Sequence, residues 1–498
     1  MSFTLNNPVL RQTVFWSILL LVGASQACLA QSGPTQRPNI LVILADDMGY
    51  GDLGCYGSQQ IETPFLDQLA EGGIRCTQGY VSGNVCAPSR AGFLTGRYQQ
   101  RFGFEHNLGA PNDKTSVPQQ LGIPVDQPTI AQRLQASGYR TGLVGKWHVG
   151  ETDPGMLPNA KGFDYFFGMR NGSHPYFPTA EKNHLWRNDQ QVTEIEAPYL
   201  TDWFTDQAIQ FIQADQDQPW FLFLSFNTPH TPLQAKPVDL QRFAHIPHPK
   251  RRTYAAMQYC MDQNIGRIMQ TLQANELWDN TLIVFFSDNG GSVTSSHACN
   301  APLNGMKGSF LEGGIRVPFL FHWPAELPTG ITYQQPMISL DLMPTFLAAA
   351  GVKLPEEFRG NGKSRRSVVY DGVNLLPHLK GEMEAPPHSQ LYWRMALRGS
   401  AIRSGDWKLI HCVHTPPMLF DLKSDPSEQN NLYAAHPEKA AELWEQLNQW
   451  EFSLEDSPHW LEDVVWQKYN QRLYQQEYNL TQPRPDQWPT PWAGKKEK

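Results

Sequence analysis

The sequence has few cysteines, no excess of basic residues and little that could cross a membrane. Seven cysteines among 498 residues do not make the disulfide framework that stabilises small secreted domains. The formal net charge of −8 argues against general attraction to polyanions, so no nucleic-acid partner is expected. An anionic ligand would need a local basic pocket. The length allows one large domain with a sizeable core and a smaller domain.

The one apolar run of targeting length lies at the N-terminus. Arg11 precedes an apolar stretch over residues 14–24, and small residues follow it. This order is typical of a secretory signal peptide, and the run is too short to span a bilayer. We therefore expect residues 1–30 to be a signal peptide, the protein to be exported to the periplasm or the extracellular space, and no stable membrane insertion. Cys28 would allow a lipoprotein anchor, but residues 25–27 lack the apolar residue usual at the start of such a site.

Buried-strand patterns alternate with helical patterns after the signal peptide. Continuous apolar runs, typical of strands buried on both faces, occupy residues 40–45, 139–144, 220–226 and 281–287. Amphipathic helical patterns lie between these runs, and one of them begins with a capping box at Thr129. The alternation predicts an α/β fold with a large mixed, mostly parallel sheet sandwiched by helices.

The pattern changes in the last quarter of the chain. Residues 401–411 are typical of two strands joined by a turn, residues 418–422 of another short strand, and a helix is predicted from Pro437. We therefore predict a main domain over residues 37–384. A small C-terminal α+β domain with an antiparallel sheet, together with its tail, is predicted over residues 385–498.

Four predicted strands end in polar residues suited to catalysis. These endings are Asp46-Asp47, Lys146 with His148, Asn227 with His230, and Asp288-Asn289. Because open parallel sheets bind ligands at the carboxyl ends of their strands, we expect these side chains to form one active site. The two acidic endings offer only oxygen ligands, which suit a hard cation, calcium before magnesium. Taken alone, either acidic pair is also compatible with a helix cap or a plain turn.

A second motif is Cys86-Ala87-Pro88-Ser89-Arg90. Pro88 near a predicted helix start and Arg90 in its first turn place Cys86 at a helix N-terminus, where free backbone amides favour negative charge. A lone cysteine in that position is either a nucleophilic thiolate of low pKa or, more commonly, an inert buried residue. These residues alone leave both possibilities open.

Together these motifs resemble the type I sulfatase family of the alkaline-phosphatase-like superfamily. The resemblance runs from about residue 37 to residue 432. The motifs, in family order, are Pro38-Asn39-Ile40, Asp46-Asp47, Cys86 to Arg90, Leu94 to Arg97, Gly145 to His148, Pro229-His230, Ser287 to Gly290, Lys307-Gly308, Glu312 to Gly314 and Arg403 to Lys408. The resemblance implies a sulfuric ester hydrolase whose catalytic domain is residues 37–384.

The resemblance also implies a modified nucleophile. A formylglycine-generating maturase would convert Cys86 to formylglycine (3-oxoalanine), and an oxygen of the hydrated aldehyde would bind one calcium ion and attack sulfur. The implied metal ligands are Asp46, Asp47, Cys86, Asp288 and Asn289. Asp288 would also take the proton from the attacking hydroxyl group.

Five further side chains are implied to act on the sulfate group or its leaving oxygen. Arg90, Lys146 and Lys307 would neutralise charge on the sulfuryl oxygens in the transition state. His230, with Lys307, would protonate or stabilise the leaving alkoxide. His148 would deprotonate the second hydroxyl group of the hydrated aldehyde, which expels sulfate.

The expected substrate is a sulfated carbohydrate. Residues 96–104 resemble bacterial sulfatases that act on sulfated polysaccharides, which favours a polysaccharide or its oligosaccharides. Candidate sugar contacts are His106, His174, Trp393 and Arg394. The basic run at residues 250–252 would suit a sulfated polymer, but it is more typical of a solvated loop.

Other functions stay open at this level. One is an arylsulfatase of broad specificity, and another is a phosphodiesterase or phosphonate hydrolase of the same superfamily, which would prefer phosphorus esters. A hydrolase with an unmodified cysteine nucleophile would be killed by thiol alkylation. A protein that only binds sulfated glycans would be expected to lack some of the ligands, and the full set argues against it.

Overall fold

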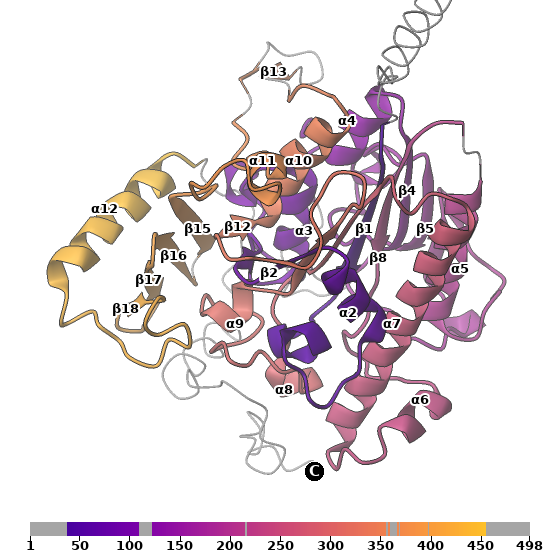
Figure 1. Cartoon of the computed structure of the whole chain (residues 1–498), viewed down its shortest axis with the longest axis horizontal. Coiled ribbons are helices and arrows are strands. Elements are labelled where there is room, and N and C mark those ends of the chain that lie inside the picture. Colours follow the sequence, from indigo (N-terminus) through magenta and orange to yellow (C-terminus); the bar gives the residue numbers. More distant parts are fainter. Residues whose placement is uncertain are drawn as a thin grey trace, which may run out of the picture. The chain divides into compact units, whose positions relative to one another are not determined.

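The computed structural model describes residues 37–108, 122–214, 217–354, 357–358, 366–367, 369–396 and 398–454 (Figure 1). The predicted signal peptide and the end of the predicted C-terminal tail lie outside these residues. Among the described residues, no helix is both long enough and apolar enough to cross a bilayer.

A ten-stranded mixed sheet forms the centre of the main body. Its strand order is β11-β2-β10-β9-β1-β8-β4-β5-β6-β7. The strands are β11 (Ile331–Tyr333), β2 (Ile74–Cys76), β10 (Phe319–His322), β9 (Thr281–Ser287), β1 (Asn39–Ala45), β8 (Trp220–Ser225), β4 (Arg140–Lys146), β5 (Tyr165–Met169), β6 (Leu185–Arg187) and β7 (Gln190–Gln191). The five strands from β9 to β5 are parallel, and β10, β6 and β7 pair antiparallel. The predicted mostly parallel sheet is confirmed.

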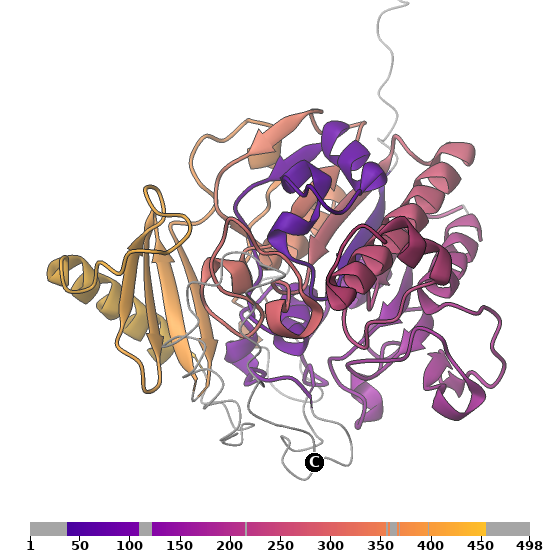
Figure 2. The same ribbon diagram turned by 90° about the horizontal axis from the view of Figure 1, so that it is seen from below.

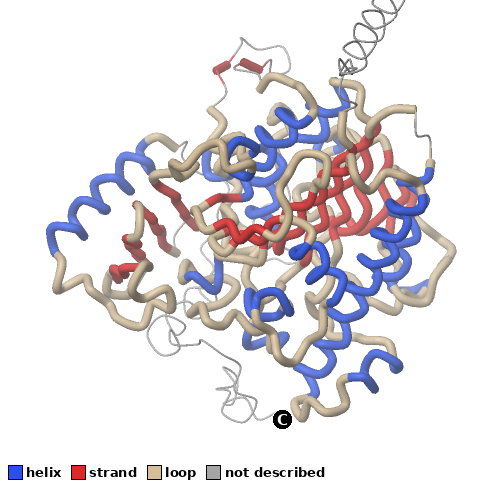
Figure 3. The backbone as a smooth tube through the Cα atoms, viewed as in Figure 1, coloured by secondary structure: helices blue, strands red, loops and turns tan. Residues whose placement is uncertain are grey.

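Helices cover both faces of this sheet (Figure 3). On one face lie α2 (Pro64–Glu71), α5 (Leu200–Gln213) and α7 (Pro249–Ala274); on the other lie α3 (Cys86–Thr95), α4 (Ile130–Ala136) and α10 (Leu342–Ala349). Strand β1 serves both cores because successive side chains point to opposite faces. Ile40 and Val42 pack with the α3 side, whereas Leu41 and Ile43 pack with the α7 side.

The remaining elements of the main body are short. They are α6 (Pro237–Arg242), α8 (Val293–Ser296), α9 (Glu312–Ile315), α11 (Leu376–Leu379), the paired strands β3 (Gly79–Tyr80) and β12 (Met337–Ile338), and the paired strands β13 (Glu357–Phe358) and β14 (Arg366–Ser367). The predicted capping box of α4 is present. The Gln132 amide donates to Thr129 Oγ1 over 3.2 Å, and the Thr129 amide donates to Gln132 Oε1 over 3.1 Å.

A separate antiparallel sheet follows near the C-terminus, as predicted. Its strands are β15 (Gln390–Met395), β16 (Gly399–Ser404), β17 (Trp407–Cys412) and β18 (Met418–Asp421), in that order. Gly405 adopts the positive φ of 58° that closes the turn between β16 and β17. Helix α12 (Pro437–Phe452) packs on the outer face of this sheet, away from the main body (Figure 2).

A buried charged cluster joins the small sheet to the main body. Lys408 on β17 donates to Glu312 Oε1 over 2.8 Å and to Glu428 Oε1 over 2.9 Å, and all three residues are fully buried. Burial opposes ionisation of Glu312, but the ammonium group of Lys408 lowers its pKa to about 2. Burial raises the pKa of Glu428 to about 7. We call these three residues the Lys408 cluster.

Candidate active site

The polar strand endings meet at one edge of the sheet. Strands β9, β1, β8 and β4 are consecutive neighbours, and all four run parallel. Their carboxyl ends therefore bring the predicted residues of four distant segments together. These residues are Asp46, Asp47, Lys146, His148, Asn227, His230, Asp288 and Asn289. All but His230 are buried, and the His230 side chain is 18% exposed.

Cys86 is the first residue of helix α3, as the motif predicted. Its Sγ lies 3.4 Å from Asp46 Oδ1 and 3.8 Å from Asp47 Oδ1, and the Lys307 ammonium group donates to it over 3.1 Å. Burial, followed by the charge of Asp288, raises the pKa of the Cys86 thiol. The surroundings therefore hold a protonated thiol in the centre of the site.

Each carboxylate of the site has its own cationic partner. The pairs are Lys146 Nζ with Asp46 Oδ2 (2.6 Å), Lys307 Nζ with Asp47 Oδ1 (2.6 Å) and Arg90 Nε with Asp288 Oδ2 (2.9 Å). Burial opposes ionisation of Asp46 and Asp47, but Lys146 and Lys307 outweigh it and lower the pKa of each carboxyl. Burial and the charge of Asp46 instead raise the pKa of Asp288. Three carboxylates and three cations leave the site with no net charge.

The two histidines differ in their surroundings. His148 is buried in the left-handed backbone region, with φ of 58°. Burial and the nearby charge of Lys146 hold its pKa well below the usual range, so the ring is neutral. The Nδ1 of His230 lies 2.6 Å from the Thr231 carbonyl oxygen and its Nε2 lies 3.7 Å from Asp47 Oδ2. Because a carbonyl oxygen only accepts, Nδ1 of His230 carries a proton.

The site has the donor chemistry for a hard cation. Ligand atoms of four side chains, Asp46, Asp47, Cys86 and His230, all lie within 4.8 Å of one another. The buried Oδ1 of Asn289 has no hydrogen-bond partner among the described residues, while its Nδ2 donates to Asp47 Oδ1 over 2.7 Å. A buried acceptor without a donor is costly, and a cation beside the carboxylates would satisfy it. Of the predicted ligands, Asp288 is held by Arg90 over 2.9 Å. His230, which was not among the predicted ligands, belongs to the group of close ligand atoms.

Comparison with known proteins decides the family. Residues 38–352 match the sulfatase family model, and residues 307–456 match the model for the C-terminal region of N-sulphoglucosamine sulphohydrolase. The chain belongs to the sulfatase family. It is 33% identical to arylsulfatase A of Bos taurus, over 88% of this chain and 90% of the relative.

Solved structures give the same fold assignment. The crystal structure of Ps i-CgsB is 36% identical to this sulfatase, with a TM-score of 0.78 over 88% of this chain and 97% of that one. The structure of Ps i-CgsB in complex with k-i-k-neocarrahexaose is 35% identical, with a TM-score of 0.77 over the same shares. With the arylsulfatase relatives, these matches identify the protein as a sulfatase hydrolase.

Sequence reasoning missed two residues that hold members of the candidate site by hydrogen bonds. Ser225, the last residue of β8, accepts from Arg90 Nη1 over 2.5 Å and donates to the Lys146 carbonyl over 2.7 Å. The Tyr176 hydroxyl donates to the carbonyl oxygens of Asn227 and His230. The position of Ser225 beside the polar end of β8 was a usable signal, but nothing in the sequence around Tyr176 distinguishes it.

The predicted sugar contacts are engaged inside the protein. Both ring nitrogens of His174 are bound, by the Pro175 carbonyl at 2.8 Å and by the His184 amide at 3.1 Å. Trp393 is fully buried and donates to the Val81 carbonyl. Arg394 pairs with Glu105 over 2.7 Å, and His106 is buried. These roles argue against the predicted contacts with a sugar.

The basic run at residues 250–252 is not a solvated loop. It forms the first turn of α7. Arg251 is buried in an ion pair with Asp52 Oδ1 at 2.6 Å, and Arg252 donates to the Ile246 carbonyl over 2.8 Å. The helical conformation separates the three side chains, so Lys250 alone remains an exposed cation.

Proposed function

We propose that this sulfatase releases inorganic sulfate from a sulfated carbohydrate through a formylglycine made from Cys86. The observation that carries the proposal is the position of Cys86. Its side chain stands at the N-terminus of α3, within 3.8 Å of Asp46, Asp47 and Lys307. Since the pKa of the thiol is raised there, a thiolate nucleophile is disfavoured, and an oxygen nucleophile in the same place fits the hard ligands around it.

Hydrated formylglycine supplies one hydroxyl group that attacks sulfur and a second whose deprotonation releases sulfate. Asp288 is proposed to accept the proton of the attacking hydroxyl group. Its raised pKa favours holding that proton, and Arg90 fixes the carboxylate by the 2.9 Å ion pair. His148 is proposed to accept the second proton, because its lowered pKa keeps a neutral ring available as a base.

The leaving group and the sulfuryl oxygens require cations. Lys146, Lys307 and Arg90 are proposed to bind the sulfuryl oxygens and to stabilise charge that develops in the transition state. His230 is proposed, with Lys307, to protonate or stabilise the leaving oxygen. Protonation by His230 requires its doubly protonated form, because the single proton of the neutral ring is on Nδ1, whereas the Lys307 ammonium group carries protons of its own. The Thr231 carbonyl holds Nδ1 of His230 and fixes the ring, so Nε2 is the atom presented to the site.

One calcium ion is proposed to bind Asp46, Asp47, Asp288, Asn289 and the modified side chain of residue 86. The oxygen-rich set and the unpartnered Asn289 Oδ1 support a hard cation. Because the described site is neutral without it, a divalent cation would make the site net positive. A positive site suits an anionic sulfate ester.

The carbohydrate substrate is supported by the solved relatives. Ps i-CgsB, which is 35% identical, was solved in complex with k-i-k-neocarrahexaose. The second candidate is an arylsulfatase of broad specificity, which the similarity to arylsulfatase A favours. Sulfate release from sulfated oligosaccharides and from 4-methylumbelliferyl sulfate, measured as kcat/KM, separates the two. A far higher value for the aryl ester would favour the second candidate.

Mass spectrometry of the matured enzyme tests the nucleophile. Trypsin releases residues 76–90, a peptide that contains both Cys76 and Cys86. After coexpression with a formylglycine-generating enzyme, fragmentation should place a mass loss of about 18 Da, and hydrazide reactivity, on Cys86 alone. Cys76 in the same peptide is the internal control and should alkylate. An unmodified, alkylatable Cys86 in active enzyme would overturn the proposal.

The maturase partner and export also belong to this proposal. The conversion of Cys86 needs a dedicated formylglycine-generating enzyme during biosynthesis. Export rests on residues 1–30 of the sequence alone.

A further inference from the structure

An open cavity of about 610 Å³ lies beside the site. We call it the Lys250 groove, and it is lined by Thr231, Leu233, Lys250, Thr253, Thr294 and Ser295. One wall of the groove includes Thr231, the residue after His230. The Thr231 carbonyl oxygen lies 2.6 Å from His230 Nδ1, so this wall contacts the candidate site. The opposite wall, helix α8, begins four residues after Asn289 and lies against α7 (Figure 1). The groove therefore adjoins the site on the His230 side.

The groove offers polar groups of the kind that bind sugars. Threonine and serine hydroxyl groups donate and accept hydrogen bonds, as sugar hydroxyls do. None of the described residues that line the groove is acidic. Its volume falls within the range of ordinary ligand sites, about 300–1,000 Å³. The groove is suited to a neutral or anionic polyhydroxyl chain.

Lys250 is the cation of the groove. The other two residues of its basic run are used inside the protein, Arg251 by Asp52 and Arg252 by the Ile246 carbonyl. The Lys250 ammonium group makes no ion pair or hydrogen bond with any described residue, and the side chain is exposed. It stands in the first turn of the 26-residue helix α7, whose free amides add to the attraction for an anion.

The neighbouring histidines do not compete with Lys250 for this role. His248 and His297 stack with ring centroids 3.8 Å apart next to the groove. Burial and nearby positive charge, including that of Lys250, lower the pKa of both rings. They are neutral at pH 7, so the positive charge of this wall is that of Lys250.

We infer that the Lys250 groove binds the sugar chain next to the sulfate ester being cut, with Lys250 paired to a second sulfate group on that chain. The inference rests on the proposed carbohydrate substrate and narrows it to a glycan that carries at least two sulfates within reach of each other. An ester with no adjoining chain, such as 4-methylumbelliferyl sulfate, would leave the groove empty.

The test compares Lys250→Gln with wild type in the full-length, matured enzyme. The substrates are 4-methylumbelliferyl sulfate and a carrageenan hexasaccharide with sulfates on neighbouring residues. Loss of one charge-assisted contact should raise KM for the hexasaccharide about tenfold and weaken the dependence of KM on salt. The kinetic constants for the aryl ester should not change.

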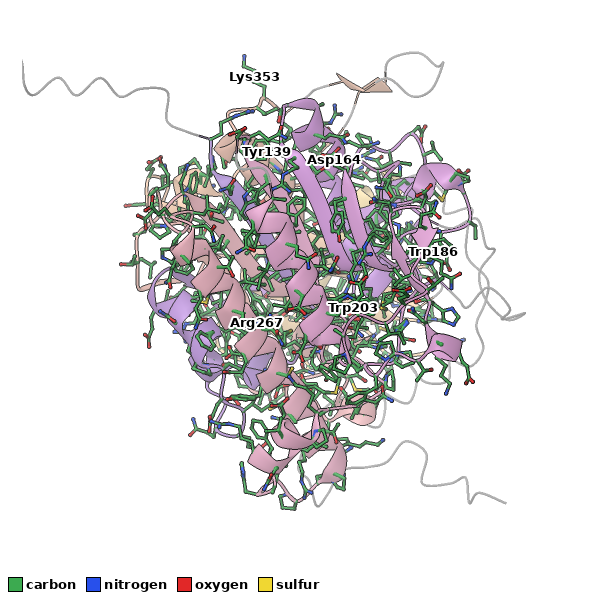
Figure 4. The ribbon with its side chains drawn as sticks, turned by 90° about the vertical axis from the view of Figure 1, so that its right-hand side faces the viewer. Tyr139, Asp164, Trp186, Trp203, Arg267 and Lys353 are labelled. Carbon is green, nitrogen blue, oxygen red and sulfur yellow. The ribbon has the colours of Figure 1, made fainter. Side chains whose placement is uncertain are left out.

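Two further variants serve as controls. Ser295→Trp, an exposed position on the groove wall, should block the hexasaccharide and spare the aryl ester. Lys353→Gln removes an exposed lysine beyond Tyr139 and Asp164, the residues just before β4 and β5, and thus at the opposite edge of the sheet (Figure 4). It should leave the kinetic constants for both substrates unchanged.

The outcomes separate the two proposals. If wild type cleaves the hexasaccharide and Lys250→Gln cleaves it equally well, the groove assignment is wrong and the substrate proposal stands. If wild type cleaves only the aryl ester, the carbohydrate proposal fails and the groove assignment fails with it. Equal losses on both substrates would show that Lys250 acts on the site itself, which also overturns the inference.

Discussion

Burial controls the chemistry of the individual groups in this site. The Cys86 thiol, 1% exposed, has a raised pKa, and so does the Asp288 carboxyl, whereas His148 has a lowered one. In each case burial shifts the pKa toward the neutral form because the charged form loses its hydration. Asp46 and Asp47 escape this trend only because a lysine contacts each of them. The site therefore combines proton carriers and fixed charges within a few ångströms.

At the scale of single residues, replacement of Cys86 tests whether its side chain is the nucleophile. Cys86→Ala and Cys86→Ser, made in a host whose only maturase accepts cysteine, should each lose at least ~10³-fold in kcat/KM. Neither side chain can be converted to the aldehyde there. Sulfate release is the measurement, and Cys299→Ser, a half-buried cysteine outside the site, should remain active. Full activity in Cys86→Ser would show that an unmodified hydroxyl group suffices.

Ser225 tests how Arg90 is positioned. Ser225→Ala removes one of two acceptors of Arg90 Nη1, which still donates to the Lys146 carbonyl over 3.1 Å, and it removes the serine donor to that carbonyl. We expect kcat to fall about tenfold, the effect of one lost hydrogen bond to a charged group, with KM nearly unchanged. Ser137→Ala, which removes a hydroxyl bond at the end of α4, is the matched control. A change in KM alone would assign Ser225 to substrate binding.

At the scale of elements, the Lys408 cluster connects a loop of the candidate active site to the small sheet. The Glu312 amide donates to Glu428 Oε2 over 2.6 Å, and Asn304 Nδ2 donates to the Glu428 carbonyl. These two contacts lie on either side of Lys307 in the chain. Strand β17 thus holds the loop that presents Lys307 to Asp47.

Lys408→Met should destabilise the protein strongly. The change leaves the buried Glu428 without its cation and leaves Glu312 with Arg316 alone, 3.2 Å from Glu312 Oε2. Breaking a buried ion pair in this way costs about 3–5 kcal/mol in the free energy of unfolding. Chemical denaturation measures it, and Lys423→Met, an exposed lysine after β18, should have little effect. A loss below about 1 kcal/mol, the value of an exposed pair, would show that the cluster relaxes or admits water.

The pKa values of the cluster predict how stability depends on pH. Glu428, with a pKa of about 7 in the folded state and 4.5 as the ordinary value, favours folding below pH 4.5 and loses that contribution as the pH rises through 7. Glu312, with a pKa of about 2, contributes above pH 4.5 and loses its contribution as the pH falls toward 2. The variant Glu428→Gln lacks the pH dependence of stability that Glu428 contributes. The stability of wild type relative to this variant should therefore be greater at pH 5 than at pH 8, and the reverse order would contradict the assignment.

The elements that could be predicted from the sequence are continuous apolar runs and helices with a clear apolar period. Strands β1, β4, β8 and β9 are apolar runs. Their composition alone indicates that both faces of each strand are buried. Strand β15 alternates buried and half-buried residues but was not predicted, because the half-buried Tyr392 stands between Leu391 and Trp393 and hides the period of two. Lys307 lies in a loop without regular structure, so only the family resemblance could place it. Ser225 and Tyr176 act through single hydrogen bonds that leave no pattern in a sequence.

At the scale of the whole molecule, the site is assembled from segments that span most of the main body. Asp46, Cys86, Lys146, His230 and Lys307 come from five separate segments, and each carboxylate needs a cation from another. A bound cation would therefore tie together parts of the fold that are far apart in the chain. Such a ligand stabilises only the folded state.

Calcium removal should consequently lower both activity and stability. Treatment of matured enzyme with a strong calcium chelator should reduce kcat and lower Tm, and added calcium should restore both. At a calcium concentration 100 times Kd, the expected gain is about 2.7 kcal/mol. Magnesium is the control and should restore less, because it demands a stricter octahedral geometry. Activity and Tm that do not respond to the chelator would contradict the metal site.

The central position of β1 in the sheet determines when the main body can fold during synthesis of the chain. Its neighbours in the sheet are β8 and β9, and β1 ends at Ala45 whereas β9 ends at Ser287. The strand is therefore synthesised long before both of its partners exist. Until residue 287 has been made, the segment around Cys86 cannot be enclosed by the strand ends that bury it. The proposed formylglycine-generating enzyme would therefore have to act on the nascent or unfolded chain. If the chain folded before the modification, Cys86 would be enclosed first, and the folded protein would keep an unconverted Cys86 thiol.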